Sequence, residues 1–180
     1  MNAAEDSVSP QMRARGVCVS GHRPEKLPEG NSLRLLKSML YGALQQAADE
    51  GYLYFYTGLS RGVDMWAADS IRLLRMEYPQ IRSIGVMPYR GFGDGRKQEE
   101  LYLYSNIIHS MDEVICLSEH YRSGCYRKRN QYLVDHSSLL IAVADNMHSG
   151  TGQTIRMAER AGLTVRRIPV IDRKESRENL

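Results

Sequence analysis

The chain has 180 residues, with 24 lysines and arginines against 21 aspartates and glutamates, and a formal net charge of +3. This length fits one domain whose core is large enough to fold without disulfides or structural metals. The mild charge permits an anionic ligand but lacks the strong basic excess of a dedicated nucleic-acid-binding protein. The three cysteines have no metal-ligand or redox spacing, which is typical of a reducing compartment.

The two ends of the chain are polar. Residues 1–15 predict a flexible N-terminal segment, residues 16–171 a single domain, and residues 172–180 a charged tail. No apolar signal-peptide core is present, and the longest strongly apolar run, 139–144, is far too short to span a bilayer. We therefore expect a cytoplasmic protein with no membrane partner.

Strand and helix patterns alternate along the chain. Apolar and β-branched runs predict six strands, at residues 17–20, 52–56, 81–87, 114–117, 139–144 and 165–170. Helical spacing of apolar residues predicts the helices between them, at residues 33–47, 63–74, 97–109, 127–135 and 154–161. Ser32 is expected to cap the first of these helices, and Cys18 and Cys116 are expected to be inert core thiols.

This alternation predicts an α/β fold with a mostly parallel sheet of about six strands, covered by helices on both faces because crossovers are right-handed. The order of the strands stays open. Ligands of such sheets lie at the carboxyl ends of the strands, near the point where the strand order reverses. The loops that follow four of the predicted strands, 20–24, 57–62, 88–96 and 145–151, should share that edge.

Two stretches carry small residues where a strand becomes a helix. The first glycine turn is residues 57–64, with Gly58, Gly62 and Asp64; the second glycine turn is residues 149–154, with Ser149, Gly150, Thr151, Gly152 and Thr154. The first N–H groups of a helix lack partners and attract an anion, so both turns predict phosphate cradles. As an alternative to the phosphate cradle at the second turn, Ser149 or Thr151 acts only as a helix cap. Three roles stay open for Asp64: a helix-start carboxylate, a ribose ligand, or a support for a neighbouring loop. Neither turn carries the Gly-Lys-Ser/Thr of a P-loop.

Two further loops offer cations. Gly21-His22-Arg23-Pro24 follows the first strand: Arg23 could bind a phosphate and His22 could donate to an oxyanion, or the loop is a tight turn with a solvated arginine. It lacks the glycine spacing of dinucleotide-binding folds. The basic run 127–129 lies among Tyr121, Tyr126 and Tyr132, as in a single-stranded nucleic-acid platform. Because successive helical residues point about 100° apart, we expect Arg127 and Lys128 to be solvated. The histidines predict no metal site.

Together these motifs resemble the SLOG superfamily, which unites the DNA-processing protein DprA with the LOG phosphoribohydrolases. The resemblance rests on Gly21-His22-Arg23-Pro24, on Thr57-Gly58 with Gly62-Val63-Asp64, on Arg129-Asn130, and on Ser149-Gly150-Thr151 with Thr154. It covers roughly residues 16–170 and is most like the YpsA-type branch. It implies a Rossmann-like three-layer fold, a nucleotide-derived ligand and a homodimer.

The resemblance also implies two alternative activities. LOG enzymes cleave nucleoside 5′-monophosphates with an Arg and a Glu; Arg129 matches that Arg, but Thr154 stands where the Glu belongs, and a hydroxyl cannot stabilise an oxocarbenium-like transition state as a carboxylate does. DprA-type proteins bind single-stranded DNA.

Our leading prediction is a binding protein for a nucleotide or an ADP-ribose-like ligand, with no cofactor, no metal and no catalytic residue assigned. The predicted ligand-binding residues are Gly21, His22, Arg23, Gly58, Gly62, Asp64, Arg129, Asn130, Ser149, Gly150, Thr151 and Thr154.

Overall fold

A computed structural model describes residues 8–145 and 147–170 of the chain, and the predicted tail 172–180 lies outside these residues. Its centre is a sheet of six strands, in the order β4-β3-β2-β1-β5-β6, in which every neighbouring pair is parallel. The strands are β1 (Gly16–Gly21), β2 (Tyr54–Thr57), β3 (Arg82–Met87), β4 (Glu113–Cys116), β5 (Leu139–Val143) and β6 (Thr164–Ile168). The predicted parallel α/β sheet is confirmed.

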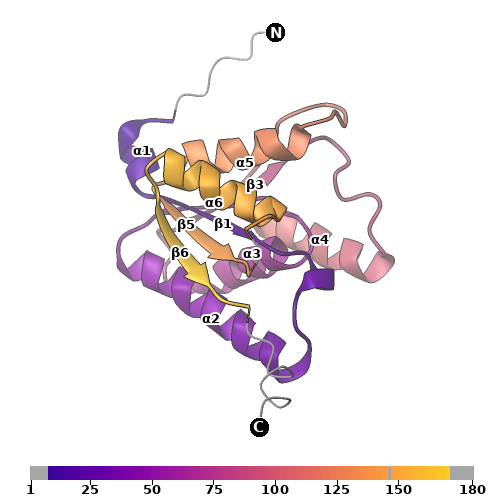
Figure 1. The fold of residues 1–180 in the computed structure, drawn as a ribbon, viewed down its shortest axis with the longest axis horizontal. Helices are drawn as coiled ribbons and strands as arrows, with labels where there is room; N and C mark the ends of the chain where they lie inside the picture. The colour runs from indigo at the N-terminus through magenta and orange to yellow at the C-terminus, as the bar shows by residue number, and fades with distance from the viewer. Residues whose placement is uncertain (1–7, 146, 171–180) are drawn as a thin grey trace.

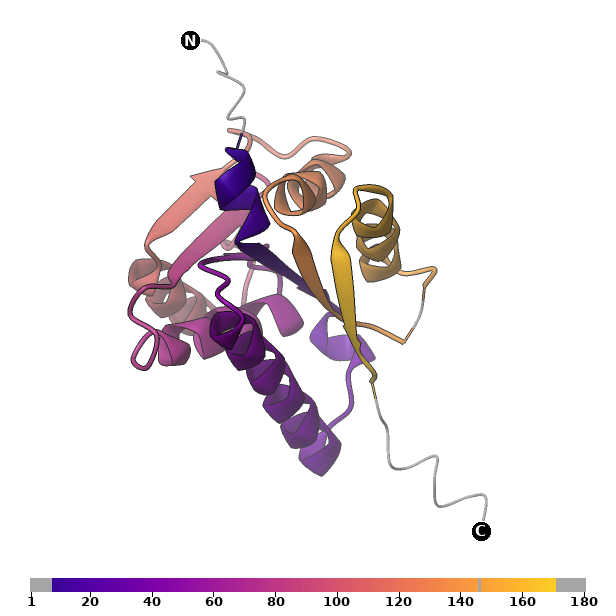
Figure 2. The same cartoon turned by 90° about the vertical axis from the view of Figure 1, so that its left-hand side faces the viewer.

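Helices cover both faces of this sheet, which makes three layers (Figures 1 and 2). The longer helices α2, α3 and α4 lie on one face, and α5 and α6 lie on the other. Their bounds, with those of the short helix α1 and the 3-10 turn η1, are α1 (Pro10–Ala14), η1 (Pro24–Lys26), α2 (Gly30–Asp49), α3 (Val63–Leu74), α4 (Gln98–Ser110), α5 (Cys125–Asp135) and α6 (Gly150–Arg160).

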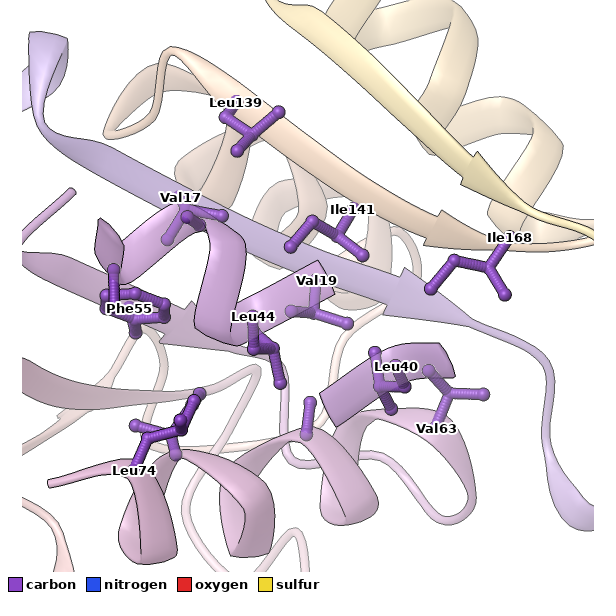
Figure 3. Close-up of a cluster of buried hydrophobic side chains, with 14 of the residues drawn as sticks. Val17, Val19, Leu40, Leu44, Phe55, Val63, Leu74, Leu139, Ile141 and Ile168 are labelled. Atoms are coloured by element: carbon purple, nitrogen blue, oxygen red, sulfur yellow. The ribbon is translucent and has the colours of Figure 1, made fainter. Parts of the chain in front are cut away.

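The core follows the two-residue period of the strands. In β1, Val17 and Val19 point toward α2 and α3, and Cys18 between them points toward α5 and α6. Figure 3 shows the first of these layers, where Leu40 and Leu44 of α2 meet side chains of β1, β2, β5 and β6. Since both faces of the central strands are buried, β5 is apolar along its whole length, as expected of a parallel sheet.

The strand order reverses between β1 and β5. The chain moves outward from β1 through β2 and β3 to β4, and then returns through α5 to β5, which pairs with the other side of β1. At this switch point Gly21 at the end of β1 is in register with Val143 at the end of β5. The loops after β1 and β5 therefore leave the sheet side by side, whereas the loop 88–96 leaves β3, two strands away from β1.

Two sequence predictions are corrected at the edges of the fold. Ser32 is not the cap of α2, because the helix already begins at Gly30 with Glu29 at the N-cap position. Cys116 is exposed rather than a core thiol, because it ends the edge strand β4. Cys18 is buried as predicted, and burial raises the pKa of its thiol to about 12.

The predicted N-terminal segment contains helix α1. Ser9 caps this helix by accepting from the Met12 amide at 3.2 Å, and Pro10 occupies its first position. Arg13 Nη2 donates to the Ala161 carbonyl at 3.2 Å, which ties α1 to the end of α6. None of the helices within residues 8–145 and 147–170 is long and apolar enough to cross a membrane.

Candidate functional site

A cavity of about 380 Å³ opens at the switch point, beside the carboxyl ends of β1 and β5. This is the place where ligands bind in open parallel sheets. Its walls come from the loop after β1, the first glycine turn, the start of α5 and the start of α6. The lining residues are Ser20, Gly21, His22, Arg23, Glu25, Lys26, Ser60, Asp64, Tyr126, Arg129, Asn130, Ser149, Gly150 and Thr151.

The second glycine turn starts α6 at the cavity. Ser149 is the N-cap, and its hydroxyl accepts from the Gly152 amide at 3.1 Å. Gly152 must be a glycine because an added Cβ would collide with the Met147 carbonyl. Gly150 has no such packing reason, since a Cβ there would meet no described atom within 4 Å. The backbone at Gly150 therefore borders open space at a helix N-terminus, where an anion is favoured.

The first glycine turn, in contrast, is filled by the protein itself. The Arg129 guanidinium donates from Nη1 to the Gly58 carbonyl and from Nη2 to Ser60 Oγ at 3.1 Å. The Asp64 carboxylate accepts from the Ser60 amide at 3.3 Å. A Cβ on Gly58 would overlap the Arg129 guanidinium, so this glycine is required by the close approach of the arginine. Asp64 thus supports its neighbouring loop, one of the three roles that the sequence left open.

Arg129 and Asp64 form a buried ion pair. Arg129 Nη1 lies 3.9 Å from Asp64 Oδ2, and each residue is only 5% exposed. Burial raises the pKa of Asp64 and the nearby guanidinium opposes that shift; burial lowers the pKa of Arg129 and the carboxylate opposes it. The charge of Arg129 is therefore largely compensated by Asp64 within the protein. Arg127 and Lys128, in contrast, are exposed, as predicted.

A chain of hydrogen bonds links the two turns. Arg129 Nε donates to Asn130 Oδ1 at 2.8 Å, and Asn130 Nδ2 donates to Thr154 Oγ1 at 2.9 Å. Thr154 Oγ1 in turn donates to the Gly150 carbonyl at 3.2 Å. Thr154 is fully buried, so its hydroxyl takes part in this series of hydrogen bonds and is not exposed at the cavity surface. Asn130 is the link through which α5 holds the starts of α3 and α6 together.

The loop after β1 closes the remaining wall. His22 is 3% exposed, and its Nε2 lies 2.7 Å from Oδ1 of Asp145, which follows β5. The loop packs closely on the start of α3: a Cβ on Gly21 would lie 2.5 Å from the Val63 side chain. Gly62 has φ +87°, and a Cβ there would lie 2.6 Å from the His22 carbonyl. Arg23 projects from this loop as an exposed cation.

The structure brings most of the predicted residues to the cavity wall and sets three behind it. Gly58 and Gly62 shape the first turn, and Thr154 lies beneath Gly150. The lining residues absent from the predicted ligand-binding set are Ser20, Glu25, Lys26, Ser60 and Tyr126; of these, the sequence analysis named Tyr126 only as a neighbour of the basic run 127–129. Two signals could have found some of them: Tyr126 stands three residues before Arg129 on one helix, and Lys26 follows the Gly21–Pro24 loop in the same short turn. Among the described residues no group of three or more His, Cys, Asp or Glu side chains could hold a metal ion.

The fold and the site define a Rossmann-like α/β protein with a polar cavity at its switch point. Residues 17–166 match the YpsA family model, described as the YspA SLOG family. The chain belongs to this family, and the resemblance predicted from its motifs is confirmed.

Relatives in sequence include the uncharacterized SPbeta prophage-derived protein YoqJ of Bacillus subtilis, 25% identical over 71% of this chain and 82% of that protein. A UPF0398 protein of Ligilactobacillus salivarius is 26% identical over 73% of this chain and 75% of its own length.

Two solved structures share the fold. The DNA processing protein A (DprA) of Streptococcus pneumoniae superposes with a TM-score of 0.58 at 19% identity over 88% of this chain; this chain spans about half of that protein, 51%. The DprA of Helicobacter pylori, described with its single-stranded DNA binding mode, gives a TM-score of 0.58 at 17% identity over 91% of this chain and 70% of that one. At these identities the likeness is one of fold.

Proposed function

We propose that this protein is a cytoplasmic binding protein for a nucleotide or an ADP-ribose-like ligand, held in the cavity at the switch point. One observation carries the proposal. The backbone of Gly150 at the start of α6 borders open space, and Gly150 lines a cavity that is also lined by cations. A helix N-terminus that faces a cavity is suited to a phosphate, because its N–H groups and its dipole both favour negative charge.

Two exposed cations strengthen this site. Arg23 and Lys26 line the same cavity from the loop after β1 and the turn that follows it. An arginine can bind a phosphate through two parallel hydrogen bonds, and a lysine adds a mobile point charge. Arg129 contributes less to a ligand, because its guanidinium is already bonded to Gly58, Ser60 and Asn130. Its part in the proposal is to fix the cavity wall.

Binding is better supported than LOG-type hydrolysis. Such hydrolysis needs a carboxylate that stabilises an oxocarbenium-like transition state. Thr154 occupies the corresponding position, is fully buried, and uses its hydroxyl to accept from Asn130 and to donate to Gly150. Single-stranded DNA binding is supported by the shared fold with DprA and by the exposed Arg127 and Lys128, which follow Tyr126 on α5.

The proposal is tested by titrating the purified protein with AMP, NAD and ADP-ribose, by calorimetry and by thermal shift. At least one of them should bind, and a concentration of 100 times Kd should stabilise the folded state by about 2.7 kcal/mol. Arg23→Gln should weaken binding about tenfold through the loss of a charge-assisted hydrogen bond.

The matched control is Arg34→Gln, which makes the same charge change on the exposed side of α2 and should leave affinity unchanged. Absence of heat and of any thermal shift with all three ligands would overturn the proposal. If both arginine variants changed the affinity equally, the ligand would not bind beside Arg23.

A further inference from the structure

Four aromatic rings gather beside the cavity, at the same edge of the sheet. Tyr89 and Phe92 lie in the loop after β3, Tyr121 lies between β4 and α5, and Tyr126 is in the first turn of α5. The Tyr89 ring centre is 5.5 Å from that of Tyr121, 5.7 Å from that of Phe92 and 6.4 Å from that of Tyr126, each pair edge-to-face. We call these four residues the aromatic cluster.

The aromatic cluster is continuous with the phosphate cavity. Tyr126 lines the cavity and also contacts the Phe92 ring, with 6.0 Å between ring centres. The Arg23 guanidinium carbon lies 6.0 Å from the centre of the Tyr126 ring, so one cation borders both places. A hydrogen bond to Tyr126 raises the pKa of Tyr89 to about 12, so the two phenols are joined to each other as well as packed edge-to-face.

The cluster is open to solvent on its outer side. Tyr121 is 63% exposed, and Tyr89, Phe92 and Tyr126 are partly exposed. An edge-to-face contact covers only one face of one of its two rings, so these contacts leave part of the ring surface of the cluster uncovered. Tyr132, which the sequence placed with these tyrosines, is not part of the cluster: it stacks on His136 at 3.8 Å, at the other end of α5.

We propose that the aromatic cluster stacks on the base of a nucleotide whose phosphate lies at the second glycine turn. This inference rests on the proposed function and adds the part of the ligand that is recognised apart from its phosphate. Base-to-ring stacking tolerates any base, because every base presents a flat π-face. Tyr126, which belongs to both the cavity and the cluster, is the ring expected to contribute most.

A single nucleotide fits this surface better than a strand of nucleic acid. The side chain of Glu25 in the cavity wall is 58% exposed, that of Asp145 near the cavity is 57% exposed, and that of Glu119 beyond the cluster is 68% exposed. A polyphosphate backbone that continued past the cavity in these directions would meet Asp145 and the ion pairs Glu25–Arg61 and Glu119–Arg90, whereas nucleic-acid tracks are lined by cations that are free to bind phosphate.

The test compares AMP with ribose 5-phosphate, which keeps the sugar and the phosphate but has no base. The wild-type protein should bind AMP at least about tenfold more tightly than ribose 5-phosphate. Tyr126→Ala should reduce that ratio to near one, because AMP loses more affinity than ribose 5-phosphate does, and Tyr126→Phe should keep it. Tyr121→Ala, at an exposed position, should lower the ratio by about twofold without affecting folding.

Each outcome decides a different point. The base-stacking inference would be overturned if the wild type bound AMP and ribose 5-phosphate equally, or if Tyr126→Ala kept the wild-type ratio of the two affinities. Either result would leave the proposed phosphate site unaffected. Failure of both ligands to bind would overturn this inference together with the proposed function. If a ten-residue single-stranded oligonucleotide bound at least tenfold more tightly than AMP, with a dependence on Tyr126, the occupant would be a nucleic acid and the single-nucleotide inference would be wrong.

Discussion

The first and second glycine turns each start a helix at the carboxyl edge of the sheet, and they differ in what lies against their backbone. At the first turn, the Arg129 guanidinium and the Asp64 carboxylate bond to Gly58 and Ser60. At the second turn, the Ser149 side chain caps the helix, and a Cβ added to Gly150 would have open space around it. In the first turn, polar backbone groups are bonded by the protein's own side chains, whereas the second turn lines the cavity at Gly150.

This difference shows that glycines at a helix start have more than one physical reason. Gly58 makes room for a buried arginine, Gly62 adopts a positive φ against the His22 carbonyl, and Gly152 lets the chain at Met147 pass. Of the glycines in the two turns, only Gly150 lines the cavity at the switch point. A helix start can bind an external anion when its N–H groups are not already hydrogen-bonded to the protein's own side chains.

The largest expected effect comes from emptying the first turn. Arg129→Ala should cost about 3–5 kcal/mol of the free energy of unfolding, because it leaves Asp64 buried without its cation and the Gly58 carbonyl without its donor. Urea unfolding followed by circular dichroism measures this loss.

Arg127→Ala is the matched control, since Arg127 is exposed on the same helix. It should change stability by no more than about 0.5 kcal/mol. If both variants unfolded at the same urea concentration, the buried pair would not be what holds the first turn.

A smaller effect separates the two turns directly. Gly58→Ala should destabilise the protein by about 1–3 kcal/mol, because its methyl group overlaps the Arg129 guanidinium and lies 2.8 Å from Asp64 Oδ2. Gly150→Ala should be neutral or slightly stabilising, by up to about 1 kcal/mol, because alanine is a better helix former and its methyl group enters open space. Melting temperatures of the two variants provide the measurement; equal losses would erase the distinction between a filled and an open turn.

The sequence predicted the sheet, its helices and most of the cavity wall, since these follow from local patterns. Local patterns predict the apolar strand β5, the helix α3 and the loops at the strand ends without knowledge of the rest of the fold. It could not predict that Arg129 reaches across to Gly58, seventy-one residues away, because that contact depends on the strand order. For the same reason Tyr89 and Phe92 gave no signal: they meet Tyr121 and Tyr126 only once β3 and α5 are placed in space.

The exposed Cys116 illustrates the same limit at the edge of the sheet. Val114, Ile115 and Cys116 of β4 are apolar like the residues of an inner strand, but β4 stands at the end of the order β4-β3-β2-β1-β5-β6, and Cys116 is exposed there. The role of Thr154 also depended on three-dimensional neighbours. Its hydroxyl is used by Asn130 and Gly150, and no spacing along the chain indicates that arrangement.

The most direct test of the open second turn is AMP binding by two glutamate variants that carry the same change. Gly150→Glu adds a carboxylate at the cavity, and Gly42→Glu adds one on the exposed side of α2, where an added Cβ likewise meets no described atom. Because a carboxylate suits a helix N-terminus, Gly150→Glu should fold normally. It should bind AMP roughly a hundredfold more weakly than the wild type, since like charges placed together cost several kcal/mol. Gly42→Glu should bind as the wild type does, and equal affinity in Gly150→Glu would contradict a phosphate site at the second glycine turn.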